Sequence, residues 1–451
     1  MKAVILGAGE SGVHLSRRLS QSEHDAEIVL VDRDPQALAA AEEAVDVLTM
    51  VGDVAHFAVQ ERAHVPKADL VVALTGSDET NLASAALAAQ LGATRTIARA
   101  DAAGFYRTPM AVEGGAIGIT HLLCASRLVD RELRRLIRGC HAELVEEFAS
   151  YSVRIALLPV TDETPVLGQA GSALRAPGSE CIGAVVRDGV LRHPAEIGRV
   201  EIGDRMLLVG SPIAVATAQH QLLQTLRKRR VVLVGGGDVG CQLAVALAQT
   251  ERRVQIVERD PVRCQQLSEM LPSATVVQGD GTSIALLRDQ QIQSADYVLA
   301  VTRSDEANLM VSLLATDLGV SHTFAIVHRH GYSDVYAHLG VHGTAGPHEV
   351  IAKTVLGLLP EGGVLSRQRL PDCSHEVVEY LLDSVLPGEV TVDDLALPPG
   401  CLLLAVVRDD SYRPPKPGLT LQPRDHLLLA QPLHSRKEVA KRLQRLAKGK
   451  P

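Results

Sequence analysis

Two short stretches, MKAVILGAGESG at residues 1–12 and RVVLVGGGDVG at residues 230–240, decide how this chain is organised. Each is an apolar run followed by glycines in the pattern G-x-G-x-x-G. In a strand–turn–helix unit the first glycine permits the tight turn, the second lets a pyrophosphate approach the backbone, and the third lets the helix pack on the strand. An acid closes the next apolar run in both copies, at Asp32 and Glu258. The repeated combination favours two dinucleotide-binding folds; the alternative is a vestigial fold whose glycines only shape a turn.

The similarity extends far beyond the glycines. Gly7 and Gly235 are 228 positions apart, and Asp32 and Glu258 are 226 apart. Three further pairs of segments share an offset of 227: Gly52-Asp53 with Gly279-Asp280, Asp69–Thr75 with Asp296–Thr302, and Asp78-Glu79 with Asp305-Glu306. This period is far longer than a solenoid repeat, so the two halves are predicted to be tandem copies.

Within the first copy, β-branched runs alternate with amphipathic stretches such as residues 81–91. Strands are expected near residues 3–6, 27–32, 46–51, 69–75, 94–98 and, more weakly, 117–119. Such alternation indicates a parallel sheet with crossovers on both faces, a doubly wound fold.

After about residue 140 the pattern changes to short strands separated by turn residues. They are expected at residues 153–158, 182–189 and 205–210, followed by a helix at 212–227, and again at 402–410 and 425–430, followed by a terminal helix. We therefore predict an α/β chain of two tandem Rossmann-like domains, each followed by a small α+β domain. The predicted boundaries are 1–140, 141–226, 227–365 and 366–451.

Composition limits the classes of function. The 451 residues are 46% apolar and 22% charged, as in a soluble globular protein. The net charge of -8 and the lack of tryptophan argue against nucleic-acid binding. The seven cysteines are scattered without a C-x-x-C pair, which suits reduced thiols in a cytoplasm. The chain shows neither a signal-peptide layout nor an apolar run near the roughly 20 residues of a membrane span, so any membrane role is expected to run through a partner.

The residues expected to contact a nucleotide follow the ends of the predicted strands. In the first copy they are Gly7, Ala8, Gly9, Glu10, Ser11, Gly12, Asp32, Arg33, Gly52, Asp53, Thr75, Gly76 and Arg99. In the second they are Gly235, Gly236, Gly237, Asp238, Val239, Gly240, Glu258, Gly279, Asp280, Thr302 and Arg303. The amides of the first helical turn face the anion. Asp32 and Glu258 can each accept two hydrogen bonds from a ribose diol, which favours NAD(H) or an adenine nucleotide over NADP(H).

Three features have competing interpretations. Arg99 follows a predicted strand and can hold a phosphate oxygen, or it forms an ordinary surface ion pair; its counterpart is Ile326. Asp53 and Asp280 reach the nucleotide, or each is only a helix N-cap. The acids at 78–79 and 305–306 are explained equally well by helix-dipole placement.

We predict no catalytic residue and no metal site. The second copy holds several histidines, at 322, 328, 330, 338, 342 and 348, but their spacings fit no metal-binding pattern, and solvated loop or interface histidines are favoured. The chain contains neither a P-loop lysine motif nor a G-x-S-x-G elbow.

The whole chain resembles the TrkA-type regulatory subunits of bacterial Trk potassium-uptake systems, which carry two RCK units (regulator of potassium conductance). The resemblance rests on both glycine fingerprints with Asp32 and Glu258, and on Thr75–Asn81 and Thr302–Asn308. The stretch Val185–Gly189 also looks like the family's C-terminal domain. In place of a proline common after the sixth strand of this family, the first copy has Ile119-Thr120, whereas Gly346-Pro347 retains it.

The resemblance implies a non-enzymatic function. Such proteins assemble as dimers, usually a ring of dimers, on the cytoplasmic face of a membrane potassium channel subunit. Binding of NAD(H), ATP or ADP changes the ring and alters gating. The expected location is therefore cytoplasmic and peripheral to the inner face of the membrane.

Two alternatives stay open. An NAD-dependent oxidoreductase would need a catalytic domain with a proton donor, and the companion domains of roughly 80 residues lack a clear His–acid constellation. The other is a nucleotide-binding scaffold without a channel partner.

Overall fold

The structure is a computed structural model that describes residues 1–21, 26–101, 117–139, 142–149, 152–174, 182–222, 230–248, 253–329, 331–359, 364–382, 388–409 and 411–447. His330, Cys140 and Cys181 lie outside these ranges. The chain divides into two compact units, Met1–Arg134 with Lys228–Leu356, and Arg135–Arg227 with Gly357–Pro451. The four domain boundaries given above stay a prediction. Among the described residues, no helix is long and apolar enough to cross a bilayer.

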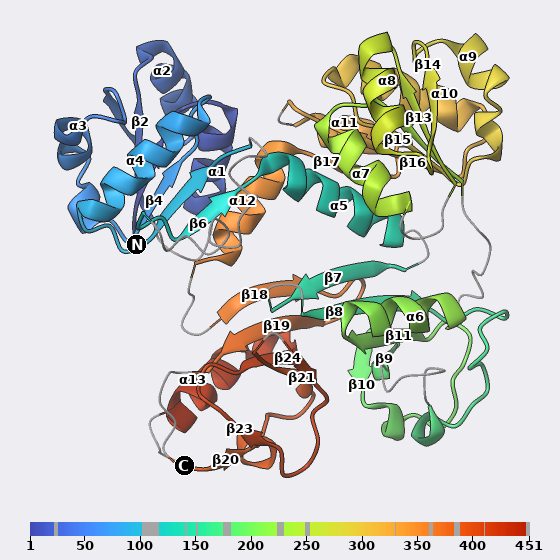
Figure 1. The fold of residues 1–451 in the computed structure, drawn as a ribbon. Helices are drawn as coiled ribbons and strands as arrows, with labels where there is room; N and C mark the ends of the chain where they lie inside the picture. The colour runs from blue at the N-terminus through green and yellow to red at the C-terminus, as the bar shows by residue number, and fades with distance from the viewer. Residues whose placement is uncertain are drawn as a thin grey trace. The chain divides into compact units, whose positions relative to one another are not determined.

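The first half of the chain forms a six-stranded parallel sheet with helices on both faces (Figure 1). Its order is β3-β2-β1-β4-β5-β6, so the topology reverses between β1 and β4. The strands are β1 Lys2–Leu6, β2 Glu27–Asp32, β3 Leu48–Val51, β4 Leu70–Ala73, β5 Thr96–Arg99 and β6 His121–Leu123. The helices are α1 Glu10–Ser20, α2 Pro35–Ala44, α3 Phe57–Arg62, α4 Asp78–Gln90 and α5 Ala125–Gly139.

The second half repeats this sheet in the order β14-β13-β12-β15-β16-β17. Its strands are β12 Arg230–Val234, β13 Arg253–Glu258, β14 Thr275–Gln278, β15 Tyr297–Ala300, β16 His322–Ile326 and β17 Gly343–Ala345. Its helices are α7 Asp238–Ala248, α8 Pro261–Met270, α9 Ile284–Asp289, α10 Asp305–Asp317, α11 Tyr332–His338 and α12 Pro347–Gly357. The tandem doubly wound fold predicted from the sequence is confirmed.

The central strand β1 shows why each sheet needs two helical layers. Its side chains alternate between faces. Val4 and Leu6 lie in one apolar cluster with Ala85 of α4. Ile5, also fully buried, lies on the opposite face, next to Gly12 of α1. A strand that is apolar on both sides is the pattern expected for a buried parallel sheet.

The predicted position of the sixth strand in the first half is wrong. The strand is β6, His121–Leu123, rather than residues 117–119. Gly118 has a φ of +78°, which breaks the extended backbone, and Ile119 is buried ahead of the strand. Ile117 and Ile119 therefore lie in the segment before the strand and not in the strand itself.

This shift also corrects the position of the missing proline. Arg99 pairs with Leu123 across the sheet, as Ile326 pairs with Ala345. Counting from these pairs, the first-half equivalent of Pro347 is Ala125, not Ile119-Thr120. Both residues begin a helix, where proline and alanine are each well tolerated.

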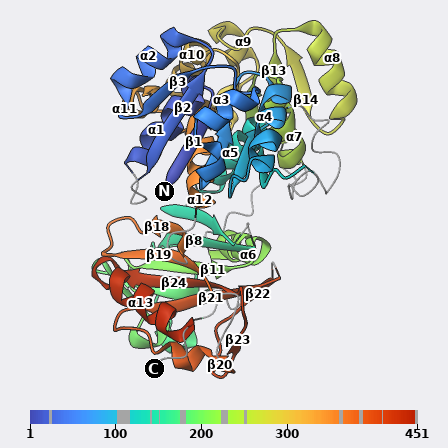
Figure 2. The same ribbon diagram turned by 90° about the vertical axis from the view of Figure 1, so that its left-hand side faces the viewer.

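The second unit contains two five-stranded antiparallel sheets, ordered β10-β9-β11-β8-β7 and β18-β19-β24-β21-β22, and the two-stranded sheet β20-β23. Figure 2 labels the strands of the β18-β19-β24-β21-β22 sheet. The strands from the first half are β7 Leu144–Phe148, β8 Val153–Pro159, β9 Ile182–Arg187, β10 Val190–Arg192 and β11 Arg205–Gly210, followed by α6 Pro212–Leu222. Those from the second half are β18 Val364–Arg369, β19 His375–Leu381, β20 Val390–Thr391, β21 Leu402–Arg408, β22 Ser411–Arg413, β23 Thr420–Leu421 and β24 His426–Pro432, followed by α13 Arg436–Ala447.

The strand predicted at 182–189 ends earlier, at Arg187, because Asp188 and Gly189 form a tight hairpin turn. Both have positive φ, +53° and +72°, as a two-residue hairpin turn of this kind requires. The chain then returns as β10, which the sequence pattern did not reveal.

One apolar cluster joins the two five-stranded sheets. It includes Val186 and Leu207 from the first half and Val377 and Leu404 from the second. Polar contacts accompany it, since Arg205 Nη1 donates to the carbonyl oxygen of Pro371 at 2.9 Å. The two C-terminal domains therefore share a core within one chain.

Each C-terminal domain also contains an arginine–aspartate pair at a matching place. Arg187 donates to both carboxylate oxygens of Asp204, each at 2.7 Å, and Arg408 does the same to Asp425 at 2.8 and 2.7 Å. The carboxylates are almost fully buried. Two parallel bonds to a buried carboxylate fix the strand ends that carry them.

We predict that Asp204→Ala lowers the free energy of unfolding by about 2–4 kcal/mol, because it leaves the half-buried Arg187 without its bidentate partner. Chemical denaturation followed by circular dichroism measures the loss. The matched control is Glu201→Ala, which removes the other carboxylate on the same guanidinium. Glu201 is 66% exposed, so its loss is expected to change stability by less than about 1 kcal/mol. Equal losses in the two variants would contradict the assignment.

Candidate functional site

The glycine turns bring strand and helix into direct backbone contact in both halves. Gly7 has a φ of +118°, and a Cβ at Gly12 would lie 1.9 Å from the carbonyl oxygen of Gly7. Gly235 and Gly240 repeat this geometry, with a φ of +113° and a distance of 2.0 Å. Any side chain at the third glycine would therefore push α1 or α7 away from its strand.

The second glycine of each fingerprint has a different environment. A Cβ at Gly9 or Gly237 would meet no atom within 4 Å. Both glycines lie immediately before a helix, where amide groups of the first turn lack partners within the helix. The turn therefore leaves room for an anion at the point where those amides and the helix dipole favour one.

The two acids at the ends of the second strands reach back to the glycine turns. Asp32 Oδ2 accepts the amide of Ala8 at 2.6 Å, and Glu258 Oε2 accepts the amide of Gly236 at 2.6 Å. The other oxygen of Asp32 accepts the amide of Asp34 at 2.9 Å. An ionised carboxylate has about four acceptor directions, so these bonds fix its position and leave capacity for a ligand's hydroxyl groups.

Asp53 and Asp280, which follow the third strands by two residues, are not helix N-caps. The helices that follow begin after His56 and Ser283 instead. Asp53 accepts the amide of Ala55 at 2.9 Å, and Asp280 accepts both the amide and the hydroxyl of Thr282, at 2.9 and 2.8 Å. The bonds from Thr282 lower the pKa of Asp280. Each aspartate therefore shapes the loop two residues onward, as Asx turns do.

A buried asparagine holds the loop after the fourth strand in each half. Asn81 accepts from the amide and the hydroxyl of Thr75, both at 2.7 Å, and donates to the carbonyl oxygen of Arg99 at 3.0 Å. Asn308 makes the same bonds to Thr302, and donates to the carbonyl oxygen of Ile326 at 3.0 Å. The asparagine thus ties the ends of two neighbouring strands together, and it places Arg99 and Ile326 at equivalent positions.

Arg99 forms an ion pair, as one of its two interpretations required. Its Nη2 lies 2.6 Å from Oδ2 of Asp101, and both side chains are about one-third exposed. Asp101 is itself held by the amide of Ala125 and donates its own amide to Asp78. The guanidinium is therefore fixed at the carboxyl end of β5, the edge at which doubly wound sheets bind ligands.

In the second half, the carboxyl ends of the strands enclose a cavity of about 640 Å³, within the size range of small-molecule sites. Eight residues singled out from the sequence line it: Gly235, Gly237, Asp238, Glu258, Gly279, Asp280, Thr302 and Arg303. Gly236, Val239 and Gly240 do not line the cavity; Gly240 packs against the backbone of Gly235. The structure therefore brings most of the second predicted set together around one hollow.

The cavity also has lining residues that the sequence analysis did not include. They are Val234, Val257, Asp260, Arg263, Gly281, Thr282, Val301, Ser304, Ala307 and Val311, together with Arg259, which follows Glu258. Arg263 stands out because its Nε donates to the carbonyl oxygen of Gly236 at 2.7 Å. The sequence could have indicated Arg263, because it is a basic residue in the first turn of α8, the helix that follows Glu258.

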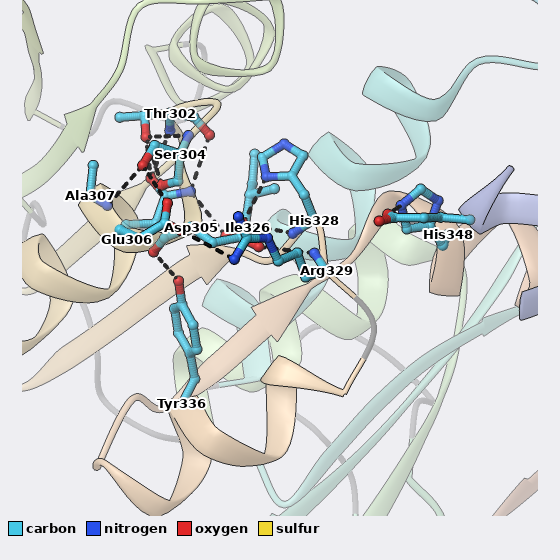
Figure 3. Close-up of polar contacts among 12 residues, drawn as sticks. Thr302, Ser304, Asp305, Glu306, Ala307, Ile326, His328, Arg329, Tyr336 and His348 are labelled. Carbon is cyan, nitrogen blue, oxygen red and sulfur yellow. Dashed lines mark hydrogen bonds and ion pairs between the residues drawn. The ribbon is translucent and has the colours of Figure 1, made fainter. Parts of the chain in front are cut away.

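Asp305 organises the loops beside this cavity (Figure 3). Its carboxylate accepts the amides of His328 and Arg329, at 2.8 and 2.9 Å, and contacts Nδ1 of His328 at 2.9 Å. Burial opposes ionisation of Asp305, but these hydrogen bonds outweigh it and lower its pKa. The Tyr336 hydroxyl donates to the backbone carbonyl of the same residue. Asp305 and Glu306 lie in the first turn of α10, so their helix-start position is confirmed.

Several of the described histidines in the second half contact other side chains. Within the described ranges, no group of three or more His, Cys, Asp or Glu side chains is arranged to hold a metal ion. His322 and His342 lie with ring centroids 5.1 Å apart, and His348 contacts Glu10 in the first half.

Comparison with known proteins identifies the family. The TrkA-N domain model matches residues 3–108 and again 231–347, and the TrkA-C domain model matches residues 377–444. The chain is 30% identical over 444 residues to the Trk system potassium uptake protein TrkA of Haemophilus influenzae, with 95% of each chain covered. This chain belongs to the TrkA family. A TrkA homolog of Methanosarcina mazei is 29% identical over 452 residues, across 98% of this chain and 99% of that protein.

The fold agrees with this assignment to the TrkA family. The crystal structure of the GsuK RCK domain covers 98% of this chain with a TM-score of 0.58 at 19% identity, and 95% of that chain is matched. A structure described as the GsuK channel bound to NAD covers 98% of this chain and 79% of its own, with a TM-score of 0.59 at 20% identity. The resemblance to tandem RCK proteins seen in the sequence is confirmed.

We predict that Gly12→Ala lowers the free energy of unfolding by about 1–3 kcal/mol, because the new methyl group collides with the Gly7 carbonyl and the helix must shift. The matched control is Gly9→Ala, in the same turn. Gly9 has ordinary extended dihedrals, φ -68° and ψ 177°, and open space around it. Gly9→Ala should therefore stay within about 1 kcal/mol of the wild type in chemical denaturation. A larger loss at Gly9 than at Gly12 would refute the packing argument.

Proposed function

We propose that this chain is a cytosolic regulatory subunit that gates a membrane potassium-uptake channel of the Trk type in response to NAD(H) and adenine nucleotides. One observation supports this most directly. A chain of the TrkA family carries two glycine turns, each bound by the carboxylate that ends the neighbouring strand. This arrangement can hold a diphosphate on backbone amides while the carboxylate receives a ribose.

In the proposed complex, the residues of each half divide the nucleotide among them. The first-turn amides of α1 and α7 hold the diphosphate, and Asp32 and Glu258 hold the ribose hydroxyls. Arg99 contributes a cation to the first site, while Arg263 and Arg303 do so in the second. The cavity at the carboxyl ends of β12–β15 supplies the volume of the second site.

The proposed role is regulatory rather than catalytic. A nucleotide shifts the open–closed equilibrium of a channel only to the extent that it binds one shape of the regulator more tightly than the other. We propose that the regulator acts as a ring formed by several copies of the chain on the cytoplasmic side of the channel subunit. NADH should then bind without being oxidised.

The nucleotide part of the proposal is tested by calorimetric titration of the full chain with NADH, ADP and ATP. Asp32→Ala should weaken binding at the first site about 10- to 100-fold, because it removes charge-assisted hydrogen bonds to the ribose. Glu258→Ala should do the same at the second site. Arg99→Ala should affect the first site alone.

The matched control for these variants is Glu43→Ala, which removes an exposed acid from α2 and should leave every affinity unchanged. The nucleotide proposal is wrong if no heat of binding appears with any of the three nucleotides. If NADH were oxidised in the presence of a small carbonyl substrate, the chain would be an oxidoreductase instead of a regulator.

The channel part is tested by co-expression with a Trk-type membrane subunit. The wild type should co-purify with it, and NADH or ADP should change potassium flux in vesicles that contain the complex. The double variant Asp32→Ala/Glu258→Ala should still co-purify but lose the response, since both substituted carboxylates lie at the glycine turns. If the wild type neither co-purifies nor alters flux, the chain is a nucleotide-binding scaffold instead.

A further inference from the structure

A histidine of the second half lies against the first glycine fingerprint. His348 is the second residue of α12, yet its Nε2 is 2.7 Å from a carboxylate oxygen of Glu10, and its Nδ1 is 2.7 Å from the hydroxyl of Ser11. Glu10 and Ser11 are the first two residues of α1. His348 is 19% exposed and lies apart from the Asp305 group (Figure 3). It therefore belongs to the surroundings of the first diphosphate-binding turn.

The charge at this turn needs a counterion if an anion is to bind. Glu10 is exposed and acidic, so its carboxylate repels a diphosphate that approaches the amides of α1. A protonated His348 neutralises Glu10 and places a positive charge at the same helix end. The other groups acting on the imidazole are Arg99, at the end of β5, and His328, in the loop after β16.

The arrangement is not repeated in the second half. Strand register places Leu123 opposite Arg99 and Ala345 opposite Ile326. Three residues after Leu123 and Ala345, the first half has Ser126 and the second half has His348. Ser126 contacts the sulfur of Cys124. The second half thus places a titratable side chain, His348, at the first fingerprint. Its counterpart in α5, Ser126, carries no charge.

We propose that His348 is part of the first nucleotide site and that, when protonated, its imidazolium holds the diphosphate against the first turn of α1. This inference rests on the proposed nucleotide binding. It makes the second half of the chain a contributor to binding in the first, through the position of α12.

The proposal has a definite dependence on pH. Burial lowers the pKa of His348, Arg99 and His328 lower it further, and Glu10 opposes them. A bound diphosphate would raise the pKa of this imidazole by attraction, so binding takes up a proton. Affinity is then highest below the pKa of the free protein and falls as pH rises through the higher pKa of the complex.

The test is calorimetric titration of the full chain with NAD⁺, whose diphosphate keeps the same charge between about pH 6 and about pH 8. Wild-type affinity at the first site should fall roughly five- to tenfold across this range. His348→Gln should bind weakly at both pH values and lose most of the dependence. His338→Gln, which removes an exposed histidine of α11, should behave as the wild type.

Thermal unfolding checks that His348→Gln is folded. A second variant makes the test independent of that result. Glu10→Gln removes the repelling carboxylate and should tighten binding several-fold near pH 8. The inference is overturned if His348→Gln keeps the wild-type pH profile, if wild-type affinity falls on acidification, or if Glu10→Gln leaves the affinity unchanged. Absence of NAD⁺ binding to the wild type at every pH would instead defeat the proposed function itself.

Discussion

The close approach of a helix to the strand before it is the constraint on which the rest of this chain depends. The carbonyl oxygen of Gly7 occupies the space that a side chain at Gly12 would need, and Gly235 and Gly240 repeat the arrangement. This contact directs the first turn of α1 or α7 toward the carboxyl edge of its sheet. The carboxylates of Asp32 and Glu258 then bind the same turns. Backbone geometry, rather than any single side chain, defines the two candidate sites.

Around this shared geometry the two halves have diverged. Asn81 and Asn308 hold the same loops with nearly the same bond lengths, yet the residue whose carbonyl each one binds is Arg99 in one half and Ile326 in the other. The second half provides His348 to the first fingerprint, where Ser126 is the counterpart. Two sites with one backbone and different charges are suited to different affinities or ligands.

The sequence predicted the architecture well because the repeat carried information over the whole chain. A constant offset of about 227 residues and the glycine spacing were enough for the sheets, and for eight of the nineteen residues that line the second cavity. Local signals failed where geometry depended on neighbours. Ile119 suggested a strand that begins at His121, and Asp53 and Asp280 suggested N-cap positions that His56 and Ser283 occupy. The contact of His348 with Glu10 joins residues more than 300 positions apart, and no local pattern records it.

The apolar core shared by the two C-terminal domains has a consequence for assembly. Val186 and Leu207 pack in one cluster with Val377 and Leu404 of the same polypeptide, so this pairing is intramolecular. Its effective concentration is set by the tether and not by expression level, and dilution cannot separate the partners. In a homodimer of two identical chains, by contrast, every substitution would appear on both sides of the twofold axis, and the interface would have to remain self-complementary. Covalent fusion removes that symmetry requirement, and each half can acquire its own chemistry without a matching change in the other.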